Sequence, residues 1–163
     1  MNSESNPFPH DPDRNEIWEI LIRRDLEAFL DADWSQTDPD FYHEEFWAID
    51  ANFTAHSDHW RLRFPDLQSY RDFWLSSAQE FQKEELDGIS KHEFIFQTDI
   101  LRDIDIQGDR ALARKRFHGR AQKKDGKELF LNWQTLYFLK RIDGHWKISG
   151  FLGYLPNPMP GKY

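Results

Sequence analysis

Cysteine is absent from the 163-residue chain, which excludes disulfide bonds, thiolate catalysis and cysteine-based metal sites. Positive charge is also in short supply, because 21 Lys and Arg residues stand against 29 Asp and Glu residues and leave a net charge of −8. Binding of phosphate backbones requires a basic face. The charge balance therefore argues against nucleic acid as a partner.

Long apolar runs are missing as well. No stretch approaches the roughly 20 apolar residues that a membrane-spanning helix needs. The first 14 residues lack the basic, apolar and small-residue pattern of a secretion signal. We therefore expect a soluble, cytoplasmic protein that does not bind membranes.

Aromatic residues are plentiful: they make up 16% of the chain and include seven Trp and fourteen Phe. Such side chains bury large areas and also line ligand pockets. The length suits one well-buried core. We predict a flexible N-terminal tail over residues 1–13, a single domain over residues 14–155 and an irregular C-terminal tail over residues 156–163.

Three helices are predicted in the first half of the chain. Apolar residues at steps of three and four predict a helix over residues 14–33. Asp38-Pro39 supplies a cap and a first-turn proline for a second helix that continues to Ile49. Residues 52–56 and 60–64 are interpreted as a short hairpin. Pro65-Asp66 then opens a third helix that runs to Phe81.

Four strands are predicted after Gly88, over residues 94–106, 111–123, 129–140 and 146–152. Turn signals separate them at Gly108-Asp109, Asp125-Gly126 and Asp143-Gly144. The predicted fold class is α+β, with three N-terminal helices packed in the hollow of a curved antiparallel sheet.

The turns also predict which side chains face the helices. A two-residue loop at Gly108-Asp109 pairs Asp103 with Arg114 and Asp99 with His118 near solvent. The same reasoning across the next turn places Phe130, Asn132, Gln134, Leu136 and Phe138 on the helix side. It leaves an outer apolar strip of Leu129, Leu131, Trp133, Tyr137 and Leu139. We expect a symmetric homodimer to bury this strip, or alternatively the C-terminal tail to cover it.

The order of segments resembles the NTF2-like superfamily, which includes SnoaL-like proteins, ketosteroid isomerases and scytalone dehydratases. The carriers are GDRALARKRF (108–117) and LYFLKRIDGHWKISGFLG (136–153), and the resemblance covers about Arg14 to Leu155. It implies a cone-shaped apolar cavity between helices and sheet, often in homodimers, with acid–base groups where the protein is an enzyme.

The isomerase pattern within that superfamily matches poorly. Its general-base carboxylate would fall near Ala55 or His56 and its buried acid near Gln134 or Leu136, where this chain has no carboxylate. The dehydratase pattern has an acidic residue just after the first helix. Asp31 or Asp33 matches that residue, and His56 matches one of the cavity-facing histidines.

Asp25 is the most informative candidate, because it falls near the centre of the apolar stripe of the first helix, between Leu21 and Phe29. A carboxylate that faces a core must be paired or protonated. Burial that favours the protonated form suits a general acid or base. The alternative is a structural ion pair with an inward Arg102 or Lys115.

Two further residues are candidate acid–base partners. Asp33 lies at the end of the first helix, near the expected cavity mouth, and His56 lies on the short hairpin. Their alternatives are a loop carboxylate and a solvated histidine. His56 and His59 have the spacing of a metal pair, but in a strand and turn they project to different faces. No metal or cofactor is predicted.

Four residues are candidate ligand contacts. Asn132 and Gln134 would orient a ligand carbonyl or hydroxyl, unless they satisfy buried backbone groups instead. Trp47 and Phe117 would line the cavity. The resulting hypothesis is a pocket protein that binds a small apolar or aromatic molecule and isomerises, dehydrates or hydrates it without a cofactor. The competing hypothesis is a non-catalytic ligand-binding or dimerisation module, including an accessory subunit of a larger complex.

Overall fold

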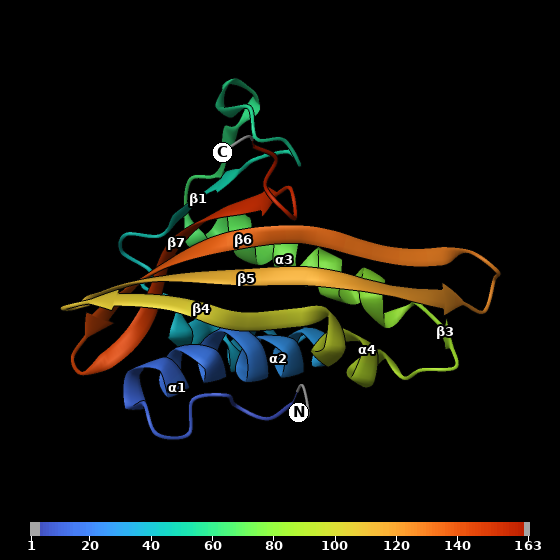
Figure 1. Ribbon diagram of the computed structural model, residues 1–163, viewed down its shortest axis with the longest axis horizontal. Helices are drawn as coiled ribbons and strands as arrows, with labels where there is room; N and C mark the ends of the chain where they lie inside the picture. The colour runs from blue at the N-terminus through green and yellow to red at the C-terminus, as the bar shows by residue number, and fades with distance from the viewer. Residues whose placement is uncertain (1–3, 162–163) are drawn as a thin grey trace.

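The computed structural model describes residues 4–161 and contains helices packed against one curved sheet (Figure 1). The helical segments are α1 (Pro12–Trp18), the π-helical η1 (Glu19–Arg24), α2 (Asp25–Asp31), the 3-10 turns η2 (Trp34–Gln36), η3 (Asp38–Asp40) and η4 (Ser57–His59), α3 (Leu67–Gln82) and α4 (Lys91–Thr98). The strands are β1 (Trp47–Asp50), β2 (Arg61–Phe64), β3 (Leu86–Asp87), β4 (Asp99–Gln107), β5 (Arg110–Lys123), β6 (Glu128–Ile142) and β7 (His145–Leu155).

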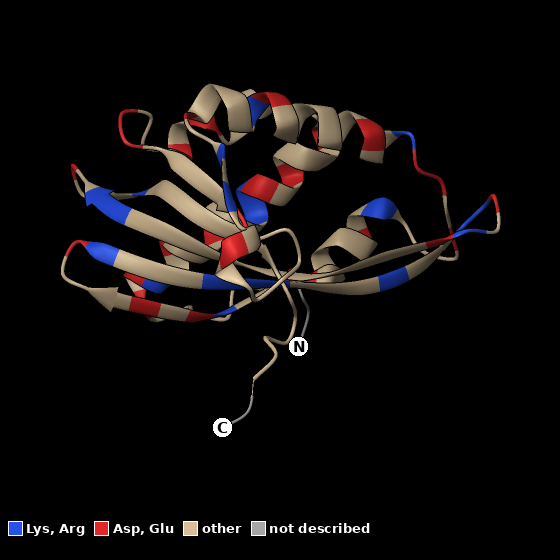
Figure 2. Cartoon of the chain, turned by 90° about the horizontal axis from the view of Figure 1, so that it is seen from above, with Lys and Arg blue, Asp and Glu red and all other residues tan. Residues whose placement is uncertain are grey.

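The seven strands form one sheet in the order β2-β1-β7-β6-β5-β3, with β4 also paired to β5. Neighbours are antiparallel except β1 and β7, which run parallel, so the sheet is mixed. The long strands β5 and β6 run the length of the molecule, and α3 lies behind them (Figure 1). Seen from above, helices and sheet form two layers (Figure 2). The predicted α+β architecture is confirmed.

The first helix is confirmed as a continuous helical segment from Pro12 to Asp31 that changes from α to π and back. Asp11 caps its start by accepting a hydrogen bond from the backbone of Arg14. Its buried stripe includes Ile17, Leu21 and Leu26. None of the helices over residues 4–161 is long and apolar enough to span a membrane.

Parts of both predicted tails contact the fold. Within the predicted N-terminal tail, Asn6 donates a hydrogen bond to the carbonyl of Asn15, and Phe8 packs against the core. Within the predicted C-terminal tail, Pro156 and Asn157 accept hydrogen bonds from β6. Residues 1–3 and 162–163 of these tails lie outside the described residues.

The helix predicted over residues 38–49 is wrong. Asp38-Pro39 opens only the 3-10 turn η3, and residues 47–50 form strand β1. Phe41 and Phe46 are buried and pack together, with ring centroids 5.5 Å apart, so apolar residues of this stretch reach the core without a helix. Pairing of β1 with β7 decides the backbone conformation here, since it satisfies the backbone groups of a sheet strand. The hairpin is therefore made by β1 and β2 around a longer loop.

The strand predicted to start at Phe94 begins instead at Asp99, because residues 91–98 form α4. The side chain of Ser90 caps this helix by accepting a hydrogen bond from the backbone of Glu93. Ser90 to Glu93 is a sequence that is typical of a helix start. This signal competes with the apolar run that follows it.

A bulge in β4 reverses the predicted orientation of Asp99. The pairing of Asp103 with Arg114 is confirmed, but the register shifts between Leu101 and Asp103. Asp99 therefore lies opposite Phe117 rather than His118, and its side chain faces the helices. An extra residue in one strand reverses the faces of all residues beyond it.

The predicted register of β6 is wrong by one residue. The turn has three loop residues, Lys124 to Gly126, since the backbone of Lys123 donates to the carbonyl of Lys127 and Gly126 has a φ of 87°. Phe117 consequently pairs with Trp133. The whole strand is reversed: the residues predicted outside face the helices, and those predicted inside lie on the outer face.

Candidate functional site

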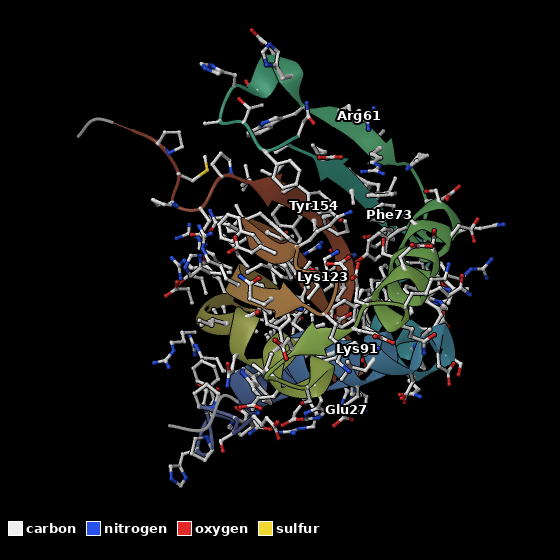
Figure 3. The ribbon with its side chains drawn as sticks, turned by 90° about the vertical axis from the view of Figure 1, so that its right-hand side faces the viewer. Glu27, Arg61, Phe73, Lys91, Lys123 and Tyr154 are labelled. Carbon is white, nitrogen blue, oxygen red and sulfur yellow. The ribbon has the colours of Figure 1, made fainter. Side chains whose placement is uncertain are left out.

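A cavity of about 350 Å³ lies between the helices and the inner face of β5, β6 and β7. Its apolar wall is made mostly of aromatic and leucine side chains from both layers. Figure 3 looks at one end of the molecule, where Phe73 of α3 and Tyr154 of β7 are neighbours; both line the cavity, and their ring centroids are 6.4 Å apart. The polar lining residues are Asp25, Tyr70, Ser77, Glu80, Glu84, Asp99, Thr135, Tyr137 and Tyr154.

A buried lysine connects two of the acidic residues of this cavity. Lys115 of β5 is 1% exposed, and its Nζ lies 3.0 Å from Oδ2 of Asp25 and 3.4 Å from Oδ2 of Asp99. The other oxygen of Asp25 accepts a hydrogen bond of 3.2 Å from Nε1 of Trp74. The three residues form the charge cluster Asp25–Lys115–Asp99, with Trp74 as a donor at its edge.

The π-helical segment η1 supplies one more partner for Lys115. Its Nζ donates to the carbonyl of Leu21 at 2.6 Å. In a regular α-helix, that carbonyl would accept from the backbone N–H of Asp25. Here the N–H of Asp25 donates to Ile22, so the carbonyl of Leu21 is available to the ammonium. Segments of π-helix are frequent at functional sites.

The cluster perturbs proton binding. Burial raises the pKa of Asp99 to about 7, because loss of water outweighs the attraction of Lys115, and the negative charge of Asp25 adds to the effect. Burial lowers the pKa of Lys115, but the charges of Asp25 and Asp99 outweigh this and raise its pKa above the ordinary lysine value. Lys115 therefore stays charged, and Asp99 exchanges its proton near neutral pH.

Tyrosine hydroxyls provide neutral polar groups in the same wall. Burial raises the pKa of Tyr137 and of Tyr70 above the usual tyrosine range, so both stay protonated. Buried Oδ1 of Asp99 has no hydrogen-bond partner among residues 4–161. The wall can thus offer donors from tyrosine and an acceptor from a carboxylate to one polar group of a ligand.

Asp25 and Phe117 lie where the sequence predicts them, in the cavity wall. Asp25 is also ion-paired with Lys115, one of the two alternatives considered, whereas Arg102 is exposed. The carboxylate remains 23% exposed, so the ion pair does not close it off from the cavity. Trp47 lies on the outer face instead, where it is 49% exposed.

The predicted positions of Asn132 and Gln134 in the cavity are wrong, because the register of β6 places both on the outer face. Gln134 donates to the carbonyl of Pro156 at 2.7 Å, and Asn132 donates to that of Asn157 at 3.0 Å. They hold the C-terminal segment against the sheet. Their amides satisfy backbone groups, which is the alternative that the sequence left open.

Asp33 and His56 do not meet Asp25 in the structure. Asp33 caps the turn η2, where its side chain accepts hydrogen bonds from Ser35 and from Gln36. Both hydrogen bonds lower the pKa of Asp33. His56 precedes η4 in the loop between β1 and β2, and it is exposed. Neither residue lines the cavity. No group of three or more His, Asp or Glu residues within positions 4–161 is arranged to hold a metal ion.

Sequence reasoning missed Asp99 and Trp74 as members of the site. The bulge in β4 that turns Asp99 inward has no signature in the sequence, since no glycine or proline marks it. Trp74 is a buried apolar residue of α3, and only tertiary packing brings its indole N–H to Asp25.

Comparison with known proteins identifies the fold. No family model matches the chain, and no curated protein matches it. Three solved structures align over most of its length. A conserved protein from Planctomyces limnophilus aligns with a TM-score of 0.58 and 15% identity over 88% of this chain and 95% of that one. NTF2-like proteins of unknown function from Shewanella oneidensis and Shewanella baltica align with TM-scores of 0.55 and 0.53 and identities of 12% and 14%; the alignments cover 85% and 88% of this chain, and 95% and 93% of those chains.

The chain has the NTF2-like fold. At such low identity the comparison extends to the architecture alone. The site of this chain must therefore be interpreted from its own residues.

Replacement of Asp99 by Asn should change how stability depends on pH. Folded Asp99 holds its proton up to about pH 7, whereas an unfolded Asp loses it near pH 3.9. The native state thus binds more protons between these values, and its stability falls as pH rises through that window, by at most about 1.4 kcal/mol per pH unit.

Urea unfolding from pH 4 to pH 8 measures this effect. The difference in unfolding free energy between wild type and Asp99→Asn should shrink as pH rises and become constant above pH 8. The control is Asp105→Asn, which changes an exposed residue of the same strand. Parallel curves for wild type and Asp99→Asn would contradict the assignment.

Proposed function

We propose that this protein binds a small apolar or aromatic molecule in the cavity and moves a proton on it without a cofactor. The supporting observation is that Asp25 belongs to the cavity wall and to the buried charge cluster at once. A carboxylate that serves only as a structural ion pair has no need of an adjoining cavity. Isomerisation, dehydration and hydration all require such proton transfers.

Each member of the cluster has a distinct part in this proposal. Asp25, whose side chain is 23% exposed, is the base that contacts the ligand. Asp99 holds a second proton near neutral pH. Lys115 is a positioning residue, because it fixes both carboxylates without lining the cavity. Thr135 and Tyr137 take over the ligand-orienting part that the sequence assigned to Asn132 and Gln134.

A bulky residue in the cavity wall should block ligand binding. Ser77 of α3 lines the cavity, while its neighbour Ser76 is exposed. Ser77→Trp should weaken binding of tryptophol, a neutral indole alcohol, at least about tenfold, because the new indole occupies the volume that the ligand needs.

Isothermal titration calorimetry measures the affinity, and Ser76→Trp is the matched control. Its affinity should equal that of the wild type. If Ser77→Trp and Ser76→Trp both bind tryptophol as the wild type does, the cavity is not the binding site.

Asp25 should act as a base on a neutral aromatic probe. 5-Nitrobenzisoxazole loses a C–H proton to a carboxylate while its N–O bond breaks, and the product is a coloured cyanophenolate. A positioned base contributes about 10²-fold or more to such a step. We expect Asp25→Asn to reduce the initial rate by that factor, with tryptophol affinity preserved.

The control for this rate is Asp31→Asn, an exposed residue at the end of the same helix. Its rate should match the wild type. Equal rates in wild type and Asp25→Asn, together with a lower unfolding free energy in the variant, would make Asp25 a structural residue. The protein would then be the non-catalytic binding module.

We also propose that the outer face of the sheet forms a homodimer. The predicted strip of leucines and aromatics faces the helices instead, and other apolar side chains lie on the outer face. Trp47 and Phe138 are 49% and 40% exposed, and both pair with Gly150, which lies between them. Gly150 adds no side chain between the two rings, and a second copy of the same patch would bury them.

Phe138→Ser should weaken self-association at least about 30-fold, because central aromatic residues dominate interface energies. Sedimentation velocity over micromolar concentrations measures it. Phe130→Ser is the matched control, since Phe130 is 43% exposed on the same face of the same strand, next to Arg120 at its other end. A wild type that remains monomeric would exclude the dimer.

A further inference from the structure

The charged groups in the cavity wall are all acidic. Asp25, Glu80, Glu84 and Asp99 line the cavity, whereas no Lys, Arg or His does within residues 4–161. The two glutamates have cationic partners outside the wall: Glu80 pairs with Lys83 at 3.0 Å, and Glu84 pairs with Lys123 at 3.1 Å. The two aspartates share a single cation.

That shared cation has no capacity left for a ligand. The ammonium of Lys115 has three N–H donors. They are directed at the carbonyl of Leu21 (2.6 Å), at Asp25 (3.0 Å) and at Asp99 (3.4 Å). When both aspartates are ionised, this cluster carries one negative charge in excess.

One acceptor of the cluster is unused. Oδ1 of Asp99 is buried and has no hydrogen-bond partner in the part of the chain that the structure describes. The side chain of Asp99 is 3% exposed, so bulk water does not compensate for the missing partner. A buried carboxylate in this state favours the arrival of a proton or of another positive group.

The aromatic side chains of the cavity wall also favour a cationic ligand. Phe29, Phe73, Trp74, Phe117, Trp133 and Phe151 all line the cavity. The faces of such rings attract cations, most strongly where water is excluded. An anionic ligand would lose its hydration and find neither a counter-ion nor a free ammonium donor.

We infer that the ligand of this cavity is a small aromatic or apolar amine that binds in its protonated form. The inference rests on the proposed function and specifies the ligand class of the same site. The ammonium supplies the second positive charge of the cluster, and the apolar remainder occupies the aromatic part of the cavity. Neutral analogues bind more weakly, and carboxylates are rejected.

Proton and ligand compete for the same excess negative charge. The groups that face Asp99 are Lys115 of β5, Asp25 of α2 and, more remotely, Tyr137 of β6. Of these, Lys115 and Tyr137 keep their protons at neutral pH, because both pKa values are raised. Binding of a cation should therefore strengthen as Asp99 becomes ionised, and it should displace the proton of Asp99.

Three probes of one shape test the inference: tryptamine, tryptophol and indole-3-propionate, which end in an ammonium, a hydroxyl and a carboxylate. Calorimetric titration of the full chain at pH 8 should give tryptamine an affinity about tenfold above that of tryptophol. Indole-3-propionate should bind more weakly than tryptophol. If tryptamine binds no better than tryptophol, or if indole-3-propionate binds as well as tryptamine, the inference is overturned.

A pH series and a variant locate the effect at Asp99. From pH 8 to pH 6 the affinity for tryptamine, whose amine stays protonated at both values, should fall severalfold, and that for tryptophol should not change. Asp99→Asn should abolish both the preference and its pH dependence, while Asp105→Asn should retain them. Unchanged tryptamine selectivity in Asp99→Asn would contradict the inference.

The two proposals fail in different ways. If tryptophol binds and the charge preference is absent, the cavity remains a binding site and only the ligand class is wrong. If none of the three probes binds at millimolar concentration, the proposed function fails and the inference fails with it.

Discussion

The ammonium of Lys115 is buried between a helix and the sheet, and a buried charge is stable only when opposite charges and hydrogen bonds surround it. Two aspartates and one backbone carbonyl meet this requirement, and two of these three groups come from irregularities of the backbone. The π-helical turn frees the carbonyl of Leu21. The bulge in β4 turns Asp99 inward. The surroundings of Lys115 therefore include both departures from regular geometry.

An ion cluster without access to a cavity would only stabilise the fold. In this chain the cluster adjoins a cavity with an aromatic wall, and two carboxylates share one ammonium. Burial, together with the negative charge of Asp25, shifts proton binding at Asp99 toward neutral pH. The same excess of negative charge supports both proposals: a carboxylate pair able to exchange a proton, and a preference for cationic ligands. The fold supplies the cavity, but the chemistry follows from these particular side chains.

The sequence predicts the architecture well because the positions of helices and strands depend on many residues at once. The helical stripe around Leu21 and the turn signals of the C-terminal half each involve several positions. Which face of a strand points to the helices depends on only a few residues. A three-residue turn at Lys124 to Gly126, in place of two, reverses the orientation of every side chain in β6. For this reason Asn132 and Gln134 were assigned to the wrong face.

Some residues of the candidate site could be predicted from the sequence, and others could not. Asp25 could be found because a lone carboxylate in an apolar stripe conflicts with its surroundings, and Lys115 could be named as one of its two possible partners. Asp99 could not be predicted, because a single inserted residue near Leu101 decides which face of the sheet its side chain lies on. Asp33 and His56 had suitable chemistry, but no local pattern of residues determines their distance from Asp25. Tertiary packing leaves both outside the cavity wall.

The protonation of Asp99 tests the central claim most directly. Carbon-13 NMR of the side-chain carboxyl, assigned by comparison with Asp99→Asn, follows that group through a pH titration of the native protein. The account predicts a midpoint at about pH 7. A midpoint near 4, the ordinary range of aspartate, would contradict it, since Asp99 would then lie outside a buried, charge-sharing cluster.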